Sequence, residues 1–210
     1  MCASPSRADA AAHPSAAAIA QAGNGHGAAP CMACHGSRGG GQVSSGFPRL
    51  AGLNQAYLLK QLNDYASGAR DNTIMTPVAR TLTATEREAL AKYYSVMPVP
   101  AAVIKAGANP SGADAPGGQL ALRGRWSKQV PACVQCHGPH GMGVGQHFPP
   151  LAGQSAAYIA SQLQAWQNGT RHNDPLQLMQ HVASALDSAD IKQVSAWFAT
   201  QPVGAIKGTP

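Results

Sequence analysis

The sequence has few aromatic residues, few charged residues and no long apolar run. Only 5% of its 210 residues are aromatic, and 11% are charged. A transmembrane helix needs roughly 18 or more consecutive apolar residues, and no such run exists, so a transmembrane segment is excluded. Residues 1–100 contain eight basic and five acidic residues, and the rest of the chain contains seven basic and four acidic residues. Because the positive charge is spread over both halves, we expect no nucleic-acid partner.

Cysteine is also scarce, but its placement is regular. Four of the five cysteines form two pairs, each followed by His and Gly: Cys31-Met32-Ala33-Cys34-His35-Gly36 and Cys133-Val134-Gln135-Cys136-His137-Gly138. C-x-x-C-H is the attachment signature of c-type haem: both thiols add to haem vinyl groups, and the histidine binds the iron. The sequence therefore predicts two covalent haem c groups, with His35 and His137 as the proximal iron ligands.

Other uses of paired cysteines fit less well. A thioredoxin-like redox pair follows a strand in a βαβ unit, and no such pattern is visible. A four-cysteine zinc site requires two pairs that lie 102 residues apart to converge. Two C-x-x-C disulfides do not require a histidine after each pair. The repeated histidine thus favours haem attachment over these alternatives.

The chain repeats itself at a spacing near 102 residues. The recurring positions are Phe47–Gly52 as Phe148–Gly153, Tyr57 as Tyr158, Gln61-Leu62 as Gln162-Leu163, and Gly68, Arg70 and Asn72 as Gly169, Arg171 and Asn173. The stretch between the repeats is rich in Pro, Gly and Ala, which is typical of a linker. We expect an N-terminal remnant or tether at 1–14, a first domain at 15–97, a linker at 98–118 and a second domain at 119–210.

Both halves show helical periodicity, and no alternating strand pattern competes with it. The pattern predicts helices at 15–22, 54–66, 84–96, 119–126, 155–167 and 187–199. Asn54 is expected to cap the helix at 54–66, which ends near Gly68. Thr83 with Glu86 forms a capping-box pattern, and Asp187 with Asp190 opens the last helix. We predict an all-α chain of two small tandem domains. Each would be wrapped around one haem, which supplies the apolar core that the composition lacks.

The function of a haem depends on its second axial position, because an open site binds small ligands whereas a filled site transfers electrons. Met75 falls in a predicted loop after the second helix, and Met179 falls in the matching region of the second half. His181 is the alternative to Met179. The first half has no histidine after His35, so a ligand scheme common to both halves needs methionine. We therefore predict Met75 and Met179 as the axial iron ligands.

Together these features resemble class I c-type cytochromes, and specifically the dihaem cytochrome c4 family. The resemblance covers about residues 16 to 203. It rests on the paired Cys-x-x-Cys-His-Gly motifs, the Phe-Pro-x-Leu-Ala-Gly segments, the Tyr-x3-Gln-Leu helices, the Gly-x-Arg-x-Asn turns and the downstream methionines. It implies two cytochrome c folds whose haem edges approach each other, in an electron carrier rather than an enzyme.

The resemblance also implies supporting roles. The carbonyls of Pro48 and Pro149 would accept a hydrogen bond from the Nδ1–H of the proximal histidine and orient its ring. Arg70 and Arg171 would either neutralise haem propionates or be plain surface residues, and the sequence leaves both readings open.

The expected role is electron transfer between respiratory partners in the bacterial periplasm. The implied donor is a quinol–cytochrome c oxidoreductase or a similar protein, and the implied acceptor is a haem–copper terminal oxidase. Two alternatives stay open: a cytochrome subunit of a dehydrogenase complex, and a dihaem peroxidase-like enzyme, which needs an open iron site. Ala8-Asp9-Ala10 resembles the end of a signal peptide, so residues 1–10 are interpreted as a signal remnant. Alternatively, Cys2 carries a lipid that anchors the protein to the membrane, or is a free thiol.

Overall fold

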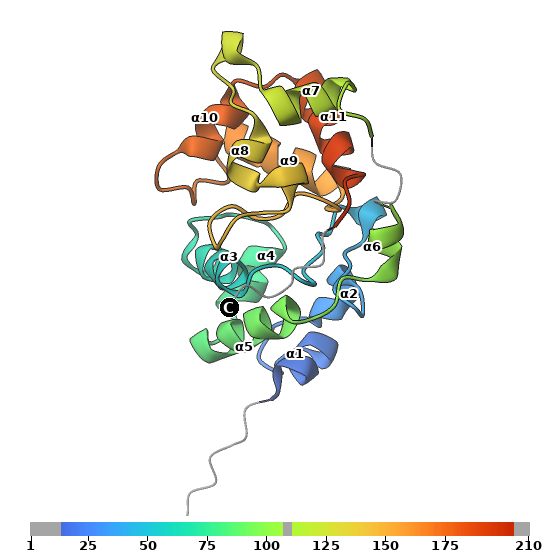
Figure 1. Cartoon of the computed structure of the whole chain (residues 1–210). Coiled ribbons are helices and arrows are strands. Elements are labelled where there is room, and N and C mark those ends of the chain that lie inside the picture. Colours follow the sequence, from blue (N-terminus) through green and yellow to red (C-terminus); the bar gives the residue numbers. More distant parts are fainter. Residues whose placement is uncertain (1–13, 107–110, 204–210) are drawn as a thin grey trace, which may run out of the picture.

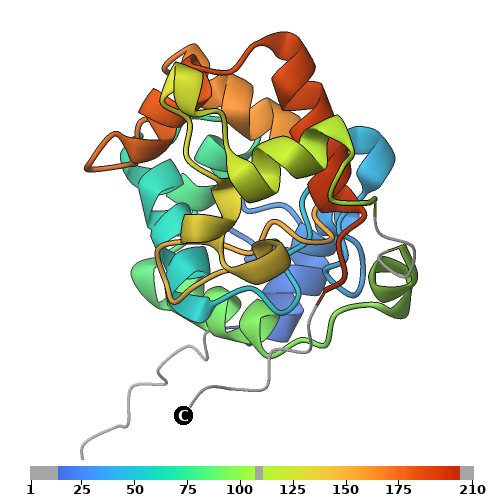
Figure 2. The ribbon, with the colours of Figure 1, turned by 45° about the horizontal axis from the view of Figure 1, so that its top comes forward.

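The computed structural model describes residues 14–106 and 111–203, and in these residues the regular structure is helical, with no strand. Two groups of helices stack on each other, the first below the second in Figure 1. The first group consists of α1 (Ala16–Ala22), α2 (Cys31–His35), α3 (Gln55–Ser67), α4 (Met75–Arg80) and α5 (Ala84–Ser95). The second consists of α7 (Pro116–Arg123), α8 (Cys133–His137), α9 (Ala156–Gln167), α10 (Leu178–Ser184) and α11 (Ser188–Ala199). The turned view in Figure 2 shows the same two groups in contact.

The predicted caps set the ends of the main helices. The side chain of Asn54 accepts the N–H of Tyr57 at 3.1 Å, and Gly68 ends α3 in a left-handed conformation. The predicted capping box at Thr83 is present, and Asp187 and Asp190, which were expected to open the last helix, form a second one. Thr83 and Glu86 bond each other at the start of α5, and Asp187 and Asp190 do so at the start of α11. These local hydrogen bonds explain why the helix starts could be predicted from sequence.

The described parts of the segment between the halves include helix, which its composition did not suggest. Helix α6 (Ala101–Ala106) lies within the expected linker, and α7 begins at Pro116 rather than at 119. Proline is well tolerated in a first helical turn, where its missing N–H has no intrahelical acceptor to lose. Gly117 and Gly118 are buried against α11, where a Cβ on Gly117 would lie 2.1 Å from the carbonyl oxygen of Gln193. The expected N-terminal segment lies outside the described residues up to position 13, and so does Cys2.

The prediction of a loop at Met75 was wrong, because Met75 is the first residue of α4. Pro77 lies in the first turn of that helix, where a missing N–H costs nothing. Asn72 caps the turn, since its side-chain oxygen accepts the N–H of Met75 at 2.9 Å. Met179 likewise lies in the first turn of α10. Each methionine is therefore held by a short helix.

Each half has its own apolar core. The first core packs α5 against α1 and α3 through Ile19, Leu53, Tyr57, Leu58, Leu90 and Tyr94. The second packs α11 against α7 and α9 through Leu120, Val130, Ile159, Leu163, Trp166, Trp197 and Phe198. The halves meet where α9 contacts the short turn at Val43–Ser45. Within the described part of the chain, no helix is long and apolar enough to cross a bilayer.

Candidate haem sites

A single cavity of about 660 Å³ extends from the first half into the second. Its lining is mostly apolar. It includes all ten residues that the sequence predicts for the haem sites: Cys31, Cys34, His35, Pro48, Met75, Cys133, Cys136, His137, Pro149 and Met179. The structure thus brings together residues that lie more than 100 positions apart in the sequence, and it joins the two predicted sites in one interior.

The two histidines occupy equivalent, buried positions at the ends of α2 and α8. His35 donates its Nδ1–H to the carbonyl oxygen of Pro48 at 2.9 Å, and His137 donates to that of Pro149 at 2.8 Å. Because Nδ1 carries the proton in this arrangement, Nε2 is free to bind a metal. Burial lowers the pKa of both imidazoles, which favours the neutral form that coordinates iron.

Two glycines allow the Phe-Pro segments to approach the histidines. Gly41 has φ +81°, and a Cβ there would lie 2.8 Å from the carbonyl carbon of Pro48. Gly143 has φ +86°, and a Cβ there would lie 2.8 Å from the ring nitrogen of Pro150. Gly41 also donates its N–H to the backbone carbonyl of His35 at 2.9 Å, and Gly143 donates to that of His137 at 2.6 Å. Glycine at these positions therefore sets the geometry of the histidine hydrogen bonds.

The four motif cysteines are unpaired and partly buried, so no disulfide joins them. Burial raises the pKa of Cys31 and raises that of Cys133 to about 11. A redox-active or zinc-binding cysteine needs an environment that favours the thiolate, which these two lack. The described residues also contain no cluster of three or more His, Cys, Asp or Glu side chains suited to a metal ion. These findings agree with thioether attachment rather than with the alternative uses.

The structure separates Met179 from its alternative, His181. Met179 packs against the second core and lines the cavity, whereas His181 is exposed and does not line it. The N–H of Met179 donates to the Asp174 carboxylate at 2.5 Å, which fixes the start of α10. Met75 is half-buried and lines the same cavity in the first half. The geometry therefore favours a methionine in each half.

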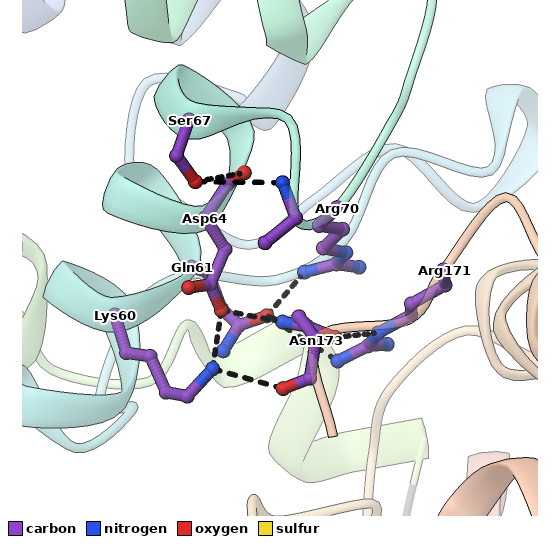
Figure 3. A network of polar contacts seen from close by, with 8 residues as sticks. Lys60, Gln61, Asp64, Ser67, Arg70, Arg171 and Asn173 are labelled. Atoms are coloured by element: carbon purple, nitrogen blue, oxygen red, sulfur yellow. Dashed lines mark hydrogen bonds and ion pairs between the residues drawn. The ribbon is translucent and has the colours of Figure 1, made fainter. Parts of the chain in front are cut away.

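Arg70 and Arg171 lie side by side between the two halves (Figure 3). Arg70 donates to Gln61 of its own half at 2.8 Å. It also donates to two residues of the second half, the Tyr158 hydroxyl at 2.9 Å and Gln162 at 2.5 Å. Arg171 donates to Gln162 at 3.0 Å and to Gln61 at 3.3 Å. The two repeats thus exchange hydrogen bonds through equivalent residues.

The reading of these arginines as plain surface residues was wrong, since Arg70 is 3% exposed and Arg171 is 5% exposed. Within the described residues, no carboxylate forms an ion pair with either guanidinium. Burial and the neighbouring Arg70 cation lower the pKa of Arg171. Two adjacent buried cations without an anion are costly. Both line the cavity, as does Trp166, whose Nε1 is buried without a partner.

These observations fit haem. The apolar cavity suits two porphyrin rings, and the unpaired arginines suit anionic propionates. When bound, each haem supplies an iron that gains or loses one electron. The chain supplies the cysteines that attach it, histidines oriented by proline carbonyls, a methionine in each half and buried positive charge. Sequence reasoning missed the bridging roles of Gln61, Gln162 and Tyr158, although their recurrence in both halves was a usable signal.

The fold and the paired sites together define a c-type cytochrome with two haem domains. The sequence model of the family described as Cytochrome c matches residues 20–95 and 127–202, one match in each half. The cytochrome c4 of Pseudomonas aeruginosa is 36% identical over 172 residues, covering 81% of this chain and 83% of that protein. The chain therefore belongs to the dihaem cytochrome c4 family, and it carries two covalently attached haem c groups.

Other similar proteins carry a more specific name. The thiosulfate dehydrogenase electron acceptor of Stutzerimonas stutzeri is 49% identical over 171 residues, covering 80% of this chain and 77% of that protein. The solved structure of a thiosulfate dehydrogenase from Marichromatium purpuratum is 39% identical with a TM-score of 0.80. It matches 91% of this chain, which spans only 41% of that larger chain. Like the cytochrome c4 and the electron acceptor, this chain is an electron-transfer protein and not itself an enzyme.

Proposed function

We propose that this chain accepts electrons from a thiosulfate dehydrogenase and passes them to a terminal oxidase. The observation that carries the proposal is its 49% identity to the Stutzerimonas stutzeri acceptor. A second acceptor of this kind, from Thiomonas intermedia, is 48% identical over 181 residues. The Pseudomonas aeruginosa cytochrome c4, by comparison, is 36% identical over a similar length. The dehydrogenase thus replaces the quinol–cytochrome c oxidoreductase as the proposed donor, while the oxidase stays the proposed acceptor.

The geometry supports a relay role for the two sites. In this proposal, His35 with Met75 and His137 with Met179 are the axial ligand pairs, so neither iron keeps an open position for a substrate. Both sets of residues line one cavity, and Arg70 and Arg171 bridge the halves beside it. A shared interior between two filled sites suits electron transfer from one haem to the other.

We place the protein in the bacterial periplasm, because haem c is attached outside the cytoplasmic membrane in bacteria. Whether Cys2 also anchors it by a lipid is tested by mass spectrometry of the protein from membranes. A mass increase on the N-terminal peptide supports an anchor, whereas an unmodified N-terminus excludes it.

A direct test measures reduction of the purified oxidised holoprotein. It is mixed with the dehydrogenase that serves the Stutzerimonas stutzeri acceptor, and absorbance follows haem reduction after thiosulfate is added. The Pseudomonas aeruginosa cytochrome c4 is the matched control protein. We expect thiosulfate-dependent reduction of both haems, faster than that of the control. Reduction that is no faster than the control, or that does not need the dehydrogenase, would overturn the proposed donor.

A further inference from the structure

The two segments that lead to the methionines are built differently, although the halves repeat. In the first half, Met75 follows Asn72 by three positions, and the side-chain oxygen of Asn72 accepts the N–H of Met75 at 2.9 Å. In the second half, Met179 follows the equivalent Asn173 by six positions. There the N–H of Met179 donates to the carboxylate of Asp174 at 2.5 Å. The capping role that Asn72 has in the first half thus belongs to Asp174 in the second.

Asn173 is held by side chains of the first half (Figure 3). Its amide nitrogen donates to Oδ2 of Asp64 at 2.6 Å and to Oε1 of Gln61 at 3.1 Å. Its backbone carbonyl accepts a hydrogen bond from Nζ of Lys60 at 3.0 Å. Lys60 also forms an ion pair with Asp64, whose side chain is 16% exposed. Two charged groups of α3 therefore hold both the side chain and the backbone of Asn173, and hydrogen bonds to charged groups are the stronger ones.

The segment between Asn173 and Met179, residues 174–178, has little support from packing. It borders the cavity, yet Leu176 is 79% exposed and Leu178 is 47% exposed. Gln177 has φ +54°, a left-handed conformation that is unfavourable for a residue other than glycine. The contacts at the start of the segment must therefore hold it in place. They come from Asp174 within the second half and, through Asn173, from the first half.

The repeat does not contain this arrangement twice. The positions equivalent to Lys60 and Asp64 in the second half are Ser161 and Ala165, neither of which carries a charge. The second half therefore cannot hold Asn72 by the ion pair that holds Asn173. The first methionine depends on a cap from its own half, whereas the second depends in part on the other half.

We propose that Lys60 and Asp64 of the first domain are positioning residues for the axial ligand of the second haem. By holding Asn173 they keep Met179 on the second iron. Contacts that form only when the segment is in its ligating conformation stabilise that conformation by their own free energy. Loss of one hydrogen bond to a charged group shifts such an equilibrium by about tenfold or more. This inference rests on Met179 as the proposed axial ligand and not on the identity of the dehydrogenase.

The test measures the affinity of the oxidised holoprotein for imidazole, which binds a haem iron only when the methionine–iron bond opens. Loss of the methionine-to-iron absorption band reports binding. NMR signals of the haem methyl groups assign the binding to one haem, and Met179→His identifies the signals of the second. The variant is Lys60→Ser with Asp64→Ala. It gives α3 the residues that α9 has at the equivalent positions, and it leaves the net charge unchanged.

In this variant we expect the second haem to bind imidazole about tenfold more tightly, while the affinity of the first stays the same. The domains should stay docked, because the N–H of Arg49 still donates to Oε1 of Gln154 at 2.8 Å. The matched control is Glu88→Ala with Lys92→Ser, which removes an acidic and a basic residue four positions apart from the exposed face of α5. It should change neither affinity.

An unchanged second-haem affinity in the variant, or equal rises at both haems, overturns the inference. If the variant does not retain two haems, Asn173→Ala decides, because it leaves α3 unaltered. It too must raise the imidazole affinity of the second haem, and an unchanged affinity overturns the inference. Combining Asp64→Ala with Asn173→Ala must give less than the product of the two single effects, since both remove one shared contact. The full product would mean that Asp64 acts by another route. A wild-type second haem without a methionine signal would refute Met179 ligation itself, and the proposed donor would be unaffected.

Discussion

Replacement of Gly41 by Ala tests whether glycine sets the geometry of the His35 hydrogen bond. Gly41 has φ +81°, and a Cβ there would lie 2.6 Å from the Phe47 carbonyl oxygen, 2.7 Å from the Arg49 nitrogen and 2.8 Å from the Pro48 carbonyl carbon. All three are backbone atoms of one segment, so the segment itself must move. That movement would pull the Pro48 carbonyl away from His35 Nδ1, which it now meets at 2.9 Å.

The expected loss of stability has two parts. A left-handed conformation costs an L-residue about 1–2 kcal/mol. Forcing an extra methyl group into a packed site adds about 1–3 kcal/mol. We therefore expect Gly41→Ala to lower the free energy of unfolding by about 2–5 kcal/mol. Gly46→Ala is the matched control, because Gly46 has φ +70° but no atom within 4 Å of its Cβ position. It should lose only about 1–2 kcal/mol.

The same pair of variants also tests whether the His35 hydrogen bond affects the reduction potential of the first haem. A weaker hydrogen bond from His35 to the Pro48 carbonyl makes the imidazole a poorer donor, which destabilises ferric iron and raises the potential of the first haem. Guanidinium unfolding of the holoproteins gives the stability, and redox titration gives the potential. Equal stability losses in the two variants would refute the steric argument. An unchanged first-haem potential in Gly41→Ala would refute the proposed link between this segment and the iron.

Further predictions concern attachment, ligation, electron flow and docking. Mass spectrometry of the denatured protein should show two haems retained, and a mass increase for only one would contradict attachment at both motifs. His181→Ala should leave the methionine-to-iron absorption band of the oxidised protein unchanged, whereas loss of that band from one haem would reverse the assignment to Met179. Met179→His should lower the potential of the second haem. Flow from donor to acceptor should then fall well below half, and retention of about half would indicate two independent carriers. Because only 11% of the residues are charged, reduction by the donor should slow only mildly as salt rises, and a steep decline would reveal a charged docking patch.

The sequence alone determined the features that depend on short-range chemistry. The two Cys-x-x-Cys-His motifs specified haem attachment, because the two thiols and the imidazole that hold one haem lie within five consecutive residues. The caps at Asn54 and Thr83 placed helix starts, because a cap bonds N–H groups only two or three residues away. The duplication showed that both halves share one plan. The loop expected at Met75 failed because the position of Pro77 within a helical turn, and not proline itself, decides whether a helix forms.

Only the tertiary structure decided what happens between the halves. Arg70 looks like any arginine in a turn, and its burial follows from Tyr158 and Gln162, which lie about 90 residues away. Arg49 and Gln154 stand at positions where the repeat departs from itself, yet neither shows its partner in the local sequence. A local sequence pattern indicates only those interactions that form between residues close to one another in the chain. The burial of these polar groups depends on how two folded surfaces meet, and that is fixed only when both domains have formed.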